Sequence, residues 1–175
     1  SRNLFLIMAT SLLSMSSQAA PALPTITAEN PFFAASTLPY QLPPFDRIKD
    51  ADYAPAFADG MRQQLVEIRA IADNPAVPTF DNTVVAMERS GRLLSRVSKV
   101  FFNLNGTNTN PVMQALERDL APKLSAHRDT ILLDGALFAR IDKLYEQRAT
   151  LALDPQSLQL LERRHTDFVR AGVPL

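Results

Sequence analysis

The chain of 175 residues contains no cysteine and no tryptophan, only two histidines, and only five glycines. Without cysteine, disulfides, thiolate metal sites and a cysteine nucleophile are excluded. The glycines stand apart from one another, which excludes a glycine-rich phosphate loop and a Gly-x-Ser-x-Gly nucleophile elbow. Lysine plus arginine and aspartate plus glutamate both total 18, so no net charge attracts nucleic acid or an anionic membrane. We therefore expect no nucleic-acid partner.

The chain nevertheless has the composition of a folded protein. Hydrophobic residues make up 46% and charged residues 21%, and this balance is typical of a globular chain with a packed core. The length suffices for about one domain.

The first residues are typical of a secretory signal peptide. An apolar segment from Leu4 to Leu13 follows Arg2 and precedes the small residues Ser17 and Ala19, so we assign residues 1–19 to the signal. Ten helical residues reach about 15 Å, half of a hydrocarbon core, so no stable membrane span is expected, and an N-terminal anchor is the alternative. Because the chain has no cysteine for disulfides, we expect that it is exported to the periplasm of a Gram-negative bacterium, where disulfides are optional. Because so little precedes the apolar segment, we also expect further residues upstream.

Residues 20–52 are predicted to form an extended, proline-rich strap. Residues 21 to 55 hold seven of the thirteen prolines, and proline fixes φ and removes a backbone donor. Aromatic residues in the strap make it too apolar for a free linker, so we expect it to lie against the body: Phe32, Phe33, Tyr40 and Phe45. A polyproline ligand for a partner's aromatic groove is the alternative.

Residues 53–175 are predicted to be all-α, with about five helices. In the first, Asp52 is the expected cap and Pro55 falls in the first turn; in the second, over residues 80 to 104, Thr79 is the cap. Apolar residues recur in both with helical spacing. Residues 105 to 109 are expected to form a polar loop. No segment shows the sustained alternation that predicts a strand.

Three further helices are predicted after this loop. The third begins at Asn110 and Pro111, ends at Asp134-Gly135, and is expected to kink or restart near Ala121 because Pro122 lies within it. The fourth carries Leu137, Ile141 and Leu144. The fifth begins at Asp154-Pro155 and ends before Gly172.

The two histidines, His127 and His165, are the only candidates for imidazole chemistry. A zincin site needs two histidines one helical turn apart with a glutamate between them, and no His-Glu-x-x-His occurs. Glu162 and His165 have the i, i+3 spacing of a carboxylate-bridged metal motif, but no second copy exists. We therefore interpret both histidines as hydrogen-bonded parts of the helical body, and assign no catalytic, cofactor-binding or metal residue.

A basic stripe lies on the predicted second helix, nearly opposite its apolar face: Arg89, Arg92, Arg96 and Lys99. It could hold an anionic partner or a peptide carboxylate. A solvated face, or one paired with neighbouring acidic groups, is the alternative. Asn105-Gly106-Thr107 matches a glycosylation acceptor, which matters only in a eukaryotic secretory pathway.

An ordered series of short motifs spans residues 30 to 175. It includes Asn30-Pro31-Phe32-Phe33, Ser36-Thr37-Leu38-Pro39-Tyr40, Asp52-Tyr53-Ala54-Pro55-Ala56-Phe57, Ser90-Gly91, Val100-Phe101-Phe102, Leu137-Phe138-Ala139-Arg140 and Phe168-Val169-Arg170-Ala171-Gly172. The series resembles the start of the thimet oligopeptidase and oligopeptidase A family of zinc metallopeptidases. Each motif alone is weakly specific, but their order is specific.

This resemblance implies a mostly helical, clam-like peptidase with a deep channel for short peptides. Similar enzymes remove dipeptides from free C-termini, or cut oligopeptides internally, with a zinc-bound water. Their metal motif lies in the later part of the chain. The resemblance therefore implies that this chain is an N-terminal scaffold and channel wall, inactive and without zinc by itself, whose partners are oligopeptide substrates and the missing catalytic region. A stand-alone, non-catalytic periplasmic module that binds peptides or a protein is the alternative.

Overall fold

The computed structural model describes residues 25–173, and this part of the chain is all-α, as predicted. It contains no strand and has five long helices and one short one. Their bounds are α1 (Asp50–Ala72), α2 (Ala86–Arg89), α3 (Arg92–Thr107), α4 (Pro111–Leu132), α5 (Gly135–Glu146) and α6 (Pro155–Ala171). A 3-10 turn, η1 (Pro39–Gln41), lies in the strap, and a π-type turn, η2 (Phe80–Val85), leads into α2.

Most predicted helix ends are confirmed by their caps. The side chain of Thr79 accepts a hydrogen bond from the backbone of Asn82, and that of Asn110 accepts one from Met113. Asp154 accepts bonds from the backbone of two residues in the first turn of α6. The same helix ends at Gly172 with a φ of 83°. These caps satisfy backbone groups that have no partner within a helix.

The predicted start of the first helix is wrong. The first helix begins at Asp50, two residues before the expected cap, because the Asp52 carboxylate accepts a bond from the backbone N–H of Lys49 while the Asp52 N–H donates to the Lys49 carbonyl. Pro55 therefore lies inside the helix and not in its first turn. The third predicted helix is α4, which runs through Pro122 with no fresh start near Ala121.

The predicted helix over residues 80 to 104 is also wrong, because it is interrupted at Ser90-Gly91. Gly91 has a left-handed φ of 67°, and a Cβ there would lie 2.5 Å from the side chain of Gln64. Its N–H donates to a carboxylate oxygen of Glu67 at 2.7 Å, which fixes the break against α1. Beyond it, α3 continues to Thr107, so most of the expected polar loop over residues 105 to 109 is helical.

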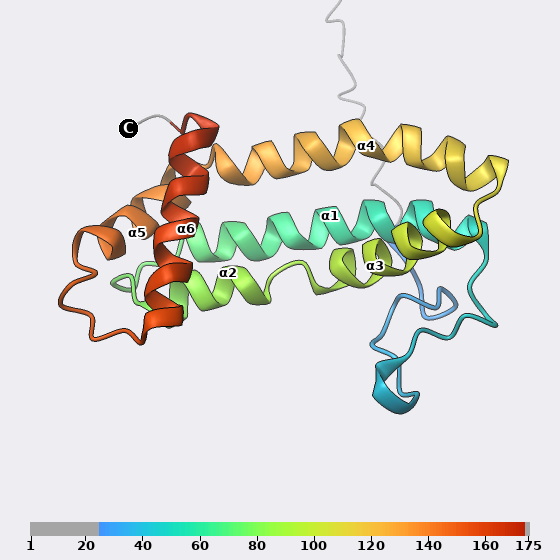
Figure 1. Ribbon diagram of the computed structural model, residues 1–175, viewed down its shortest axis with the longest axis horizontal. Coiled ribbons are helices and arrows are strands. Elements are labelled where there is room, and N and C mark those ends of the chain that lie inside the picture. The colour runs from blue at the N-terminus through green and yellow to red at the C-terminus, as the bar shows by residue number, and fades with distance from the viewer. Residues whose placement is uncertain (1–24, 174–175) are drawn as a thin grey trace, which may run out of the picture.

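Helix α1 is the central element of the fold. In Figure 1 it runs along the molecule with α4 on one side and α2 and α3 on the other, while α5 and α6 lie at its C-terminal end. Two clusters of buried side chains form, one toward each end of α1.

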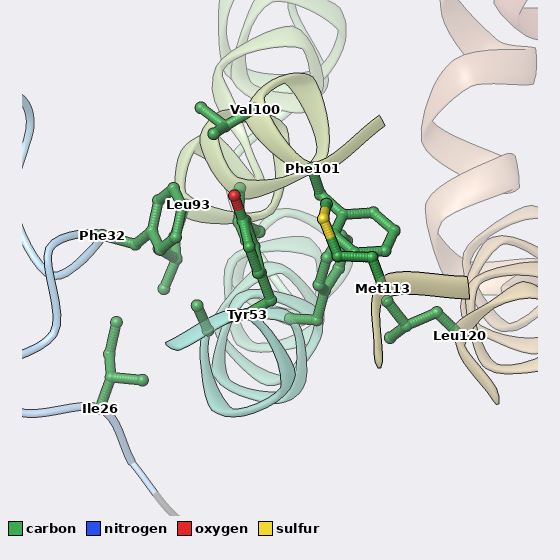
Figure 2. Close-up of a cluster of buried hydrophobic side chains, with 11 residues drawn as sticks. Ile26, Phe32, Tyr53, Leu93, Val100, Phe101, Met113 and Leu120 are labelled. Carbon is green, nitrogen blue, oxygen red and sulfur yellow. The ribbon is translucent and has the colours of Figure 1, made fainter. Parts of the chain in front are cut away.

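The first cluster joins the start of α1 to α3, to α4 and to the strap. Tyr53 lies between Phe32 of the strap and Phe101 of α3, with ring centroids 5.5 and 5.1 Å away (Figure 2). Phe57 meets the Phe101 ring edge to face at 5.4 Å. Such aromatic pairs add specific geometry to hydrophobic burial. The strap is therefore fixed to the body through Phe32, together with the buried side chain of Ile26 and a hydrogen bond from the Asn30 amide to the carbonyl of Asp52.

The second cluster joins the end of α1 to η2, α5 and α6. Its fully buried members include Val84, Leu137, Ile141, Leu161 and Phe168. Burial of these aliphatic and aromatic side chains holds α5 and α6 against each other and against α1.

The strap contacts the body less than its aromatic content suggests. Phe32 is 4% exposed, but Phe33 and Phe45 are each 53% exposed and Tyr40 is 96% exposed. The signal peptide expected over residues 1–19 lies outside the described residues, and the domain division stays a prediction. Between residues 25 and 173 no helix is long and apolar enough to cross a bilayer.

Helices α1 and α3 approach each other closely at Gly60. A Cβ on this residue would lie 2.9 Å from the backbone N and Cα of Leu94. Because backbone atoms cannot rotate away as a flexible side chain can, any larger residue must push the two helices apart.

Replacement of Gly60 by alanine is expected to destabilise the fold by about 1–3 kcal/mol through this overpacking. Gly106, also in a helix, is the matched control, since a Cβ there meets nothing within 4 Å. Gly106→Ala should stabilise the fold by about 0.5–1 kcal/mol through its higher helix propensity. Chemical denaturation of both variants measures the difference, and equal effects would contradict the close approach.

Candidate functional site

His127 is a buried residue of α4 that is tied to α1. Its Nε2 lies 2.8 Å from Oε1 of Gln64, whose own amide donates to the hydroxyl of Ser90. Because Oε1 can only accept, Nε2 carries the proton. Nδ1 is buried and has no hydrogen-bond partner. Burial lowers the pKa of His127, which keeps the ring neutral.

His165 belongs to a separate cluster on α5 and α6. Its Nε2 lies 3.0 Å from Oδ1 of Asp142, and its ring stacks on Tyr145 with centroids 3.8 Å apart. In the same cluster, the guanidinium of Arg148 lies 4.0 Å from the centre of the Tyr145 ring. Both histidines are thus hydrogen-bonded within the helical body, as the sequence indicated.

The residues considered for a metal site do not come together. Glu162 pairs loosely with Arg148, at 3.7 Å, while His165 bonds Asp142. Within residues 25–173, no three histidine, aspartate or glutamate side chains are grouped so as to hold a metal ion. The donor set present in this region therefore does not fit a zinc centre.

The basic stripe is divided by the break at Ser90-Gly91. Arg89 lies on α2, while the other three members lie on α3. Arg89 and Arg92 are exposed. Arg96 and Lys99, in contrast, line a cavity of about 310 Å³ between α3 and the strap, which we call the strap cavity.

The strap cavity has an apolar lining with positive charge on one side. The strap contributes mostly proline, alanine and aromatic side chains, and α3 contributes Val100 beside the two cations. Arg96 donates from Nη2 to the backbone carbonyl of Phe32 at 2.9 Å, so it also holds the strap in place. The sequence could not show that strap residues line this cavity, because they lie some sixty positions before the basic stripe.

A larger apolar groove lies between α1 and α4. Its volume is about 750 Å³, and we call it the α1–α4 groove. Its apolar side chains are Ala58, Met61, Leu65, Val66 and Ala126, and cationic side chains stand beside them: Arg62, Arg69 and Lys123. Val66 is 61% exposed. Each of the three cations has an acidic group within 4.0 Å, and all of those acidic groups belong to α1, α4 or the residues just after these helices.

Arg140 is a buried cation of α5. It donates to the carbonyls of Asn74 and Ala76 and to Oδ1 of Asn82, at 2.7 to 3.1 Å. It therefore holds the segment that connects α1 to η2 against α5. The only sequence feature that marks Arg140 is its place in the Leu137-Phe138-Ala139-Arg140 motif of the family resemblance.

The chain is similar in sequence to two curated proteins. It is 49% identical over 146 residues to a dipeptidyl carboxypeptidase of Salmonella typhimurium and 45% identical over 150 residues to one of Escherichia coli K12. These matches cover 83% and 86% of the chain. Most of the chain is therefore similar in sequence to one part of each of these two proteins. The chain spans about a fifth of the length of these relatives, because each match covers 22% of the relative. A scan against protein-family models returns no match.

The pH dependence of stability is expected to report the burial of His127. Its pKa is lowered in the folded chain, so below about pH 6.5 the unfolded chain binds a proton that the folded chain does not. Stability should therefore fall as the pH drops from 6.5 toward the folded-state pKa. Thermal melting of the chain and of His127→Gln between pH 5 and 8 tests this. The variant should lose less stability on acidification, and parallel curves would contradict the assignment.

Proposed function

We propose that this chain is the N-terminal scaffold and channel-wall part of an exported zinc metallopeptidase that releases C-terminal dipeptides from oligopeptides. The observation that carries the proposal is the identity of 45–49%, across most of the chain, with two proteins named dipeptidyl carboxypeptidase. Identity at this level over some 150 residues reflects common ancestry, and the ordered motifs of residues 30 to 175 agree with it.

In this proposal the hydrolytic centre lies outside the chain. The described histidines are occupied by Gln64 and Asp142, on different helices, and no metal-binding group forms around either of them. Zinc would be held by residues in the remainder of the longer protein. This chain would then form part of the channel wall and support the rest of the longer protein.

The α1–α4 groove supports a scaffold role. Its apolar side chains lie open between the two helices, and Val66 is largely exposed. Exposed apolar surface of this kind usually marks a contact with another polypeptide. We propose that the remainder of the longer protein covers it, since most of the length of each relative lies outside the match.

The proposed location is the periplasm. The apolar segment from Leu4 to Leu13 and the small residues Ser17 and Ala19 support a cleavable signal peptide. Mass spectrometry of the exported protein should then find a mature N-terminus near Ala20. Retention of residues 1 to 19 would favour a membrane anchor.

A stand-alone, non-catalytic binding module is the second candidate. The two closed clusters of buried side chains favour it, because they give α1 a core at each end without any further chain. The strap cavity would then be the binding site. The two candidates differ in whether the reading frame continues past Leu175.

The activity test uses the chain and the longer protein encoded by the same gene. The longer protein should release dipeptides from an N-terminally blocked tripeptide, lose that activity on metal chelation and regain it with zinc. A His-Glu-x-x-His motif should lie downstream of Leu175. The 175-residue chain should release no dipeptide and bind no stoichiometric zinc.

Two results would overturn this proposal. The first is a stop codon directly after Leu175, which would favour the stand-alone module. The second is one tightly bound zinc per 175-residue chain, lost in His127→Ala or His165→Ala.

A further inference from the structure

The strap cavity carries positive charge that no acidic side chain between residues 25 and 173 balances. Arg96 and Lys99 make no ion pair in this part of the chain. Four other arginines do have a carboxylate within 4.0 Å: Arg62, Arg69, Arg148 and Arg164. Exposed arginines such as Arg89, Arg92 and Arg118 also lack an ion pair in this part of the chain, but Arg96 is half-buried, so water compensates its charge less.

The Arg96 guanidinium is only partly satisfied. Its Nη2 donates to the carbonyl of Phe32, but its Nε is buried and has no hydrogen-bond partner. Burial and the neighbouring charge of Arg92 both lower the pKa of Arg96, so its surroundings disfavour the charged form. Because an arginine stays charged in proteins, this cost persists until an anion approaches.

The rest of the lining limits what that anion can be. Pro31, Ala34, Ala35 and Val100 present apolar surface, and Ser36 and Gln41 are the uncharged polar side chains. A phosphate would place several strongly hydrated oxygens against proline and alanine, where few donors exist. A single carboxylate joined to an apolar group matches both parts of the lining.

The volume sets the size of the ligand. At about 310 Å³ the strap cavity lies at the lower end of the range for small-molecule sites. It is too small for a packed helix but has room for one or two amino-acid residues. Tyr40 stands almost fully exposed at its edge, where it can contact the remaining residues of a longer ligand.

We propose that the strap cavity binds a carboxylate carried next to an apolar group, with Arg96 and Lys99 as its counter-charges. Two sources share this chemistry. One is the free C-terminus of a short peptide with an apolar last residue. The other is an aspartate or glutamate side chain flanked by apolar residues, from another segment of a longer protein. The site requires no zinc centre and does not depend on the peptidase activity proposed above.

Peptide titrations of the 175-residue chain, followed by NMR of its backbone amides, test the proposal and separate the two sources. The first probe is N-acetyl-Ala-Leu as the free acid, and the second is the same dipeptide as its C-terminal amide. The third is a peptide blocked at both ends with one internal glutamate beside leucine. Binding should shift the amides of Ala34, Ala35 and Val100, which line the cavity.

Charge variants test the roles of the two cations. Lys99→Gln should weaken binding about threefold to fivefold, since Lys99 is exposed. Arg96→Gln should weaken it about tenfold or more, and Arg96→Lys should recover part of the loss. Arg118→Gln is the matched control, because it removes the same charge from α4 at an exposed position outside the cavity lining. It should leave binding within about twofold.

Every outcome bears on the proposal. Binding of the free acid but not of the amide supports the site and identifies a peptide C-terminus as its ligand. Binding of the internal-glutamate peptide alone supports the site and identifies an acidic side chain. Absence of shifts with all three probes would overturn the proposal. Equal binding of the free acid and the amide would also overturn it. The same holds if Lys99→Gln and Arg96→Gln bind the peptide as tightly as the Arg118→Gln control.

Discussion

The close approach of α1 and α3 at Gly60 is the contact on which the rest of the fold depends. Because Gly60 has no side chain, the backbone of Leu94 can lie close to α1, and in the same interface Tyr53 and Phe57 pack against Phe101. That packing fixes the strap through Phe32 and places α3 where its cations face the strap cavity. It also leaves another face of α1 toward the α1–α4 groove.

The fold class and most caps could be predicted from local chemistry. Thr79, Asn110 and Asp154 cap the helices they precede, because a short polar side chain in front of an apolar-periodic segment has few other roles. The interruption at Gly91 was not predicted, since it depends on tertiary contacts with Gln64 and Glu67 of α1. Helical period alone continues smoothly across it.

The candidate site shows the same division between local and tertiary information. The sequence indicated Arg96 and Lys99 as possible ligands for an anion, because helical spacing places them together. It could not separate them from Arg89 and Arg92, since only the folded strap forms a cavity beside one pair and leaves the other in solvent. Three strap aromatics are exposed: Phe33, Tyr40 and Phe45. Their exposure depends on the path of the strap, which proline content does not determine.

The α1–α4 groove is the surface that we propose the remainder of a longer protein covers. The chain has no cysteine, so Val66→Cys introduces a single thiol in the groove, and Val112→Cys introduces one at similar exposure outside its lining. Rates of thiol alkylation at each site, read by peptide mass spectrometry, compare the 175-residue chain with the longer protein. The account predicts that Val66→Cys reacts readily in the chain and is protected in the longer protein, to a greater degree than Val112→Cys. Equal reactivity of Val66→Cys in both proteins would contradict it.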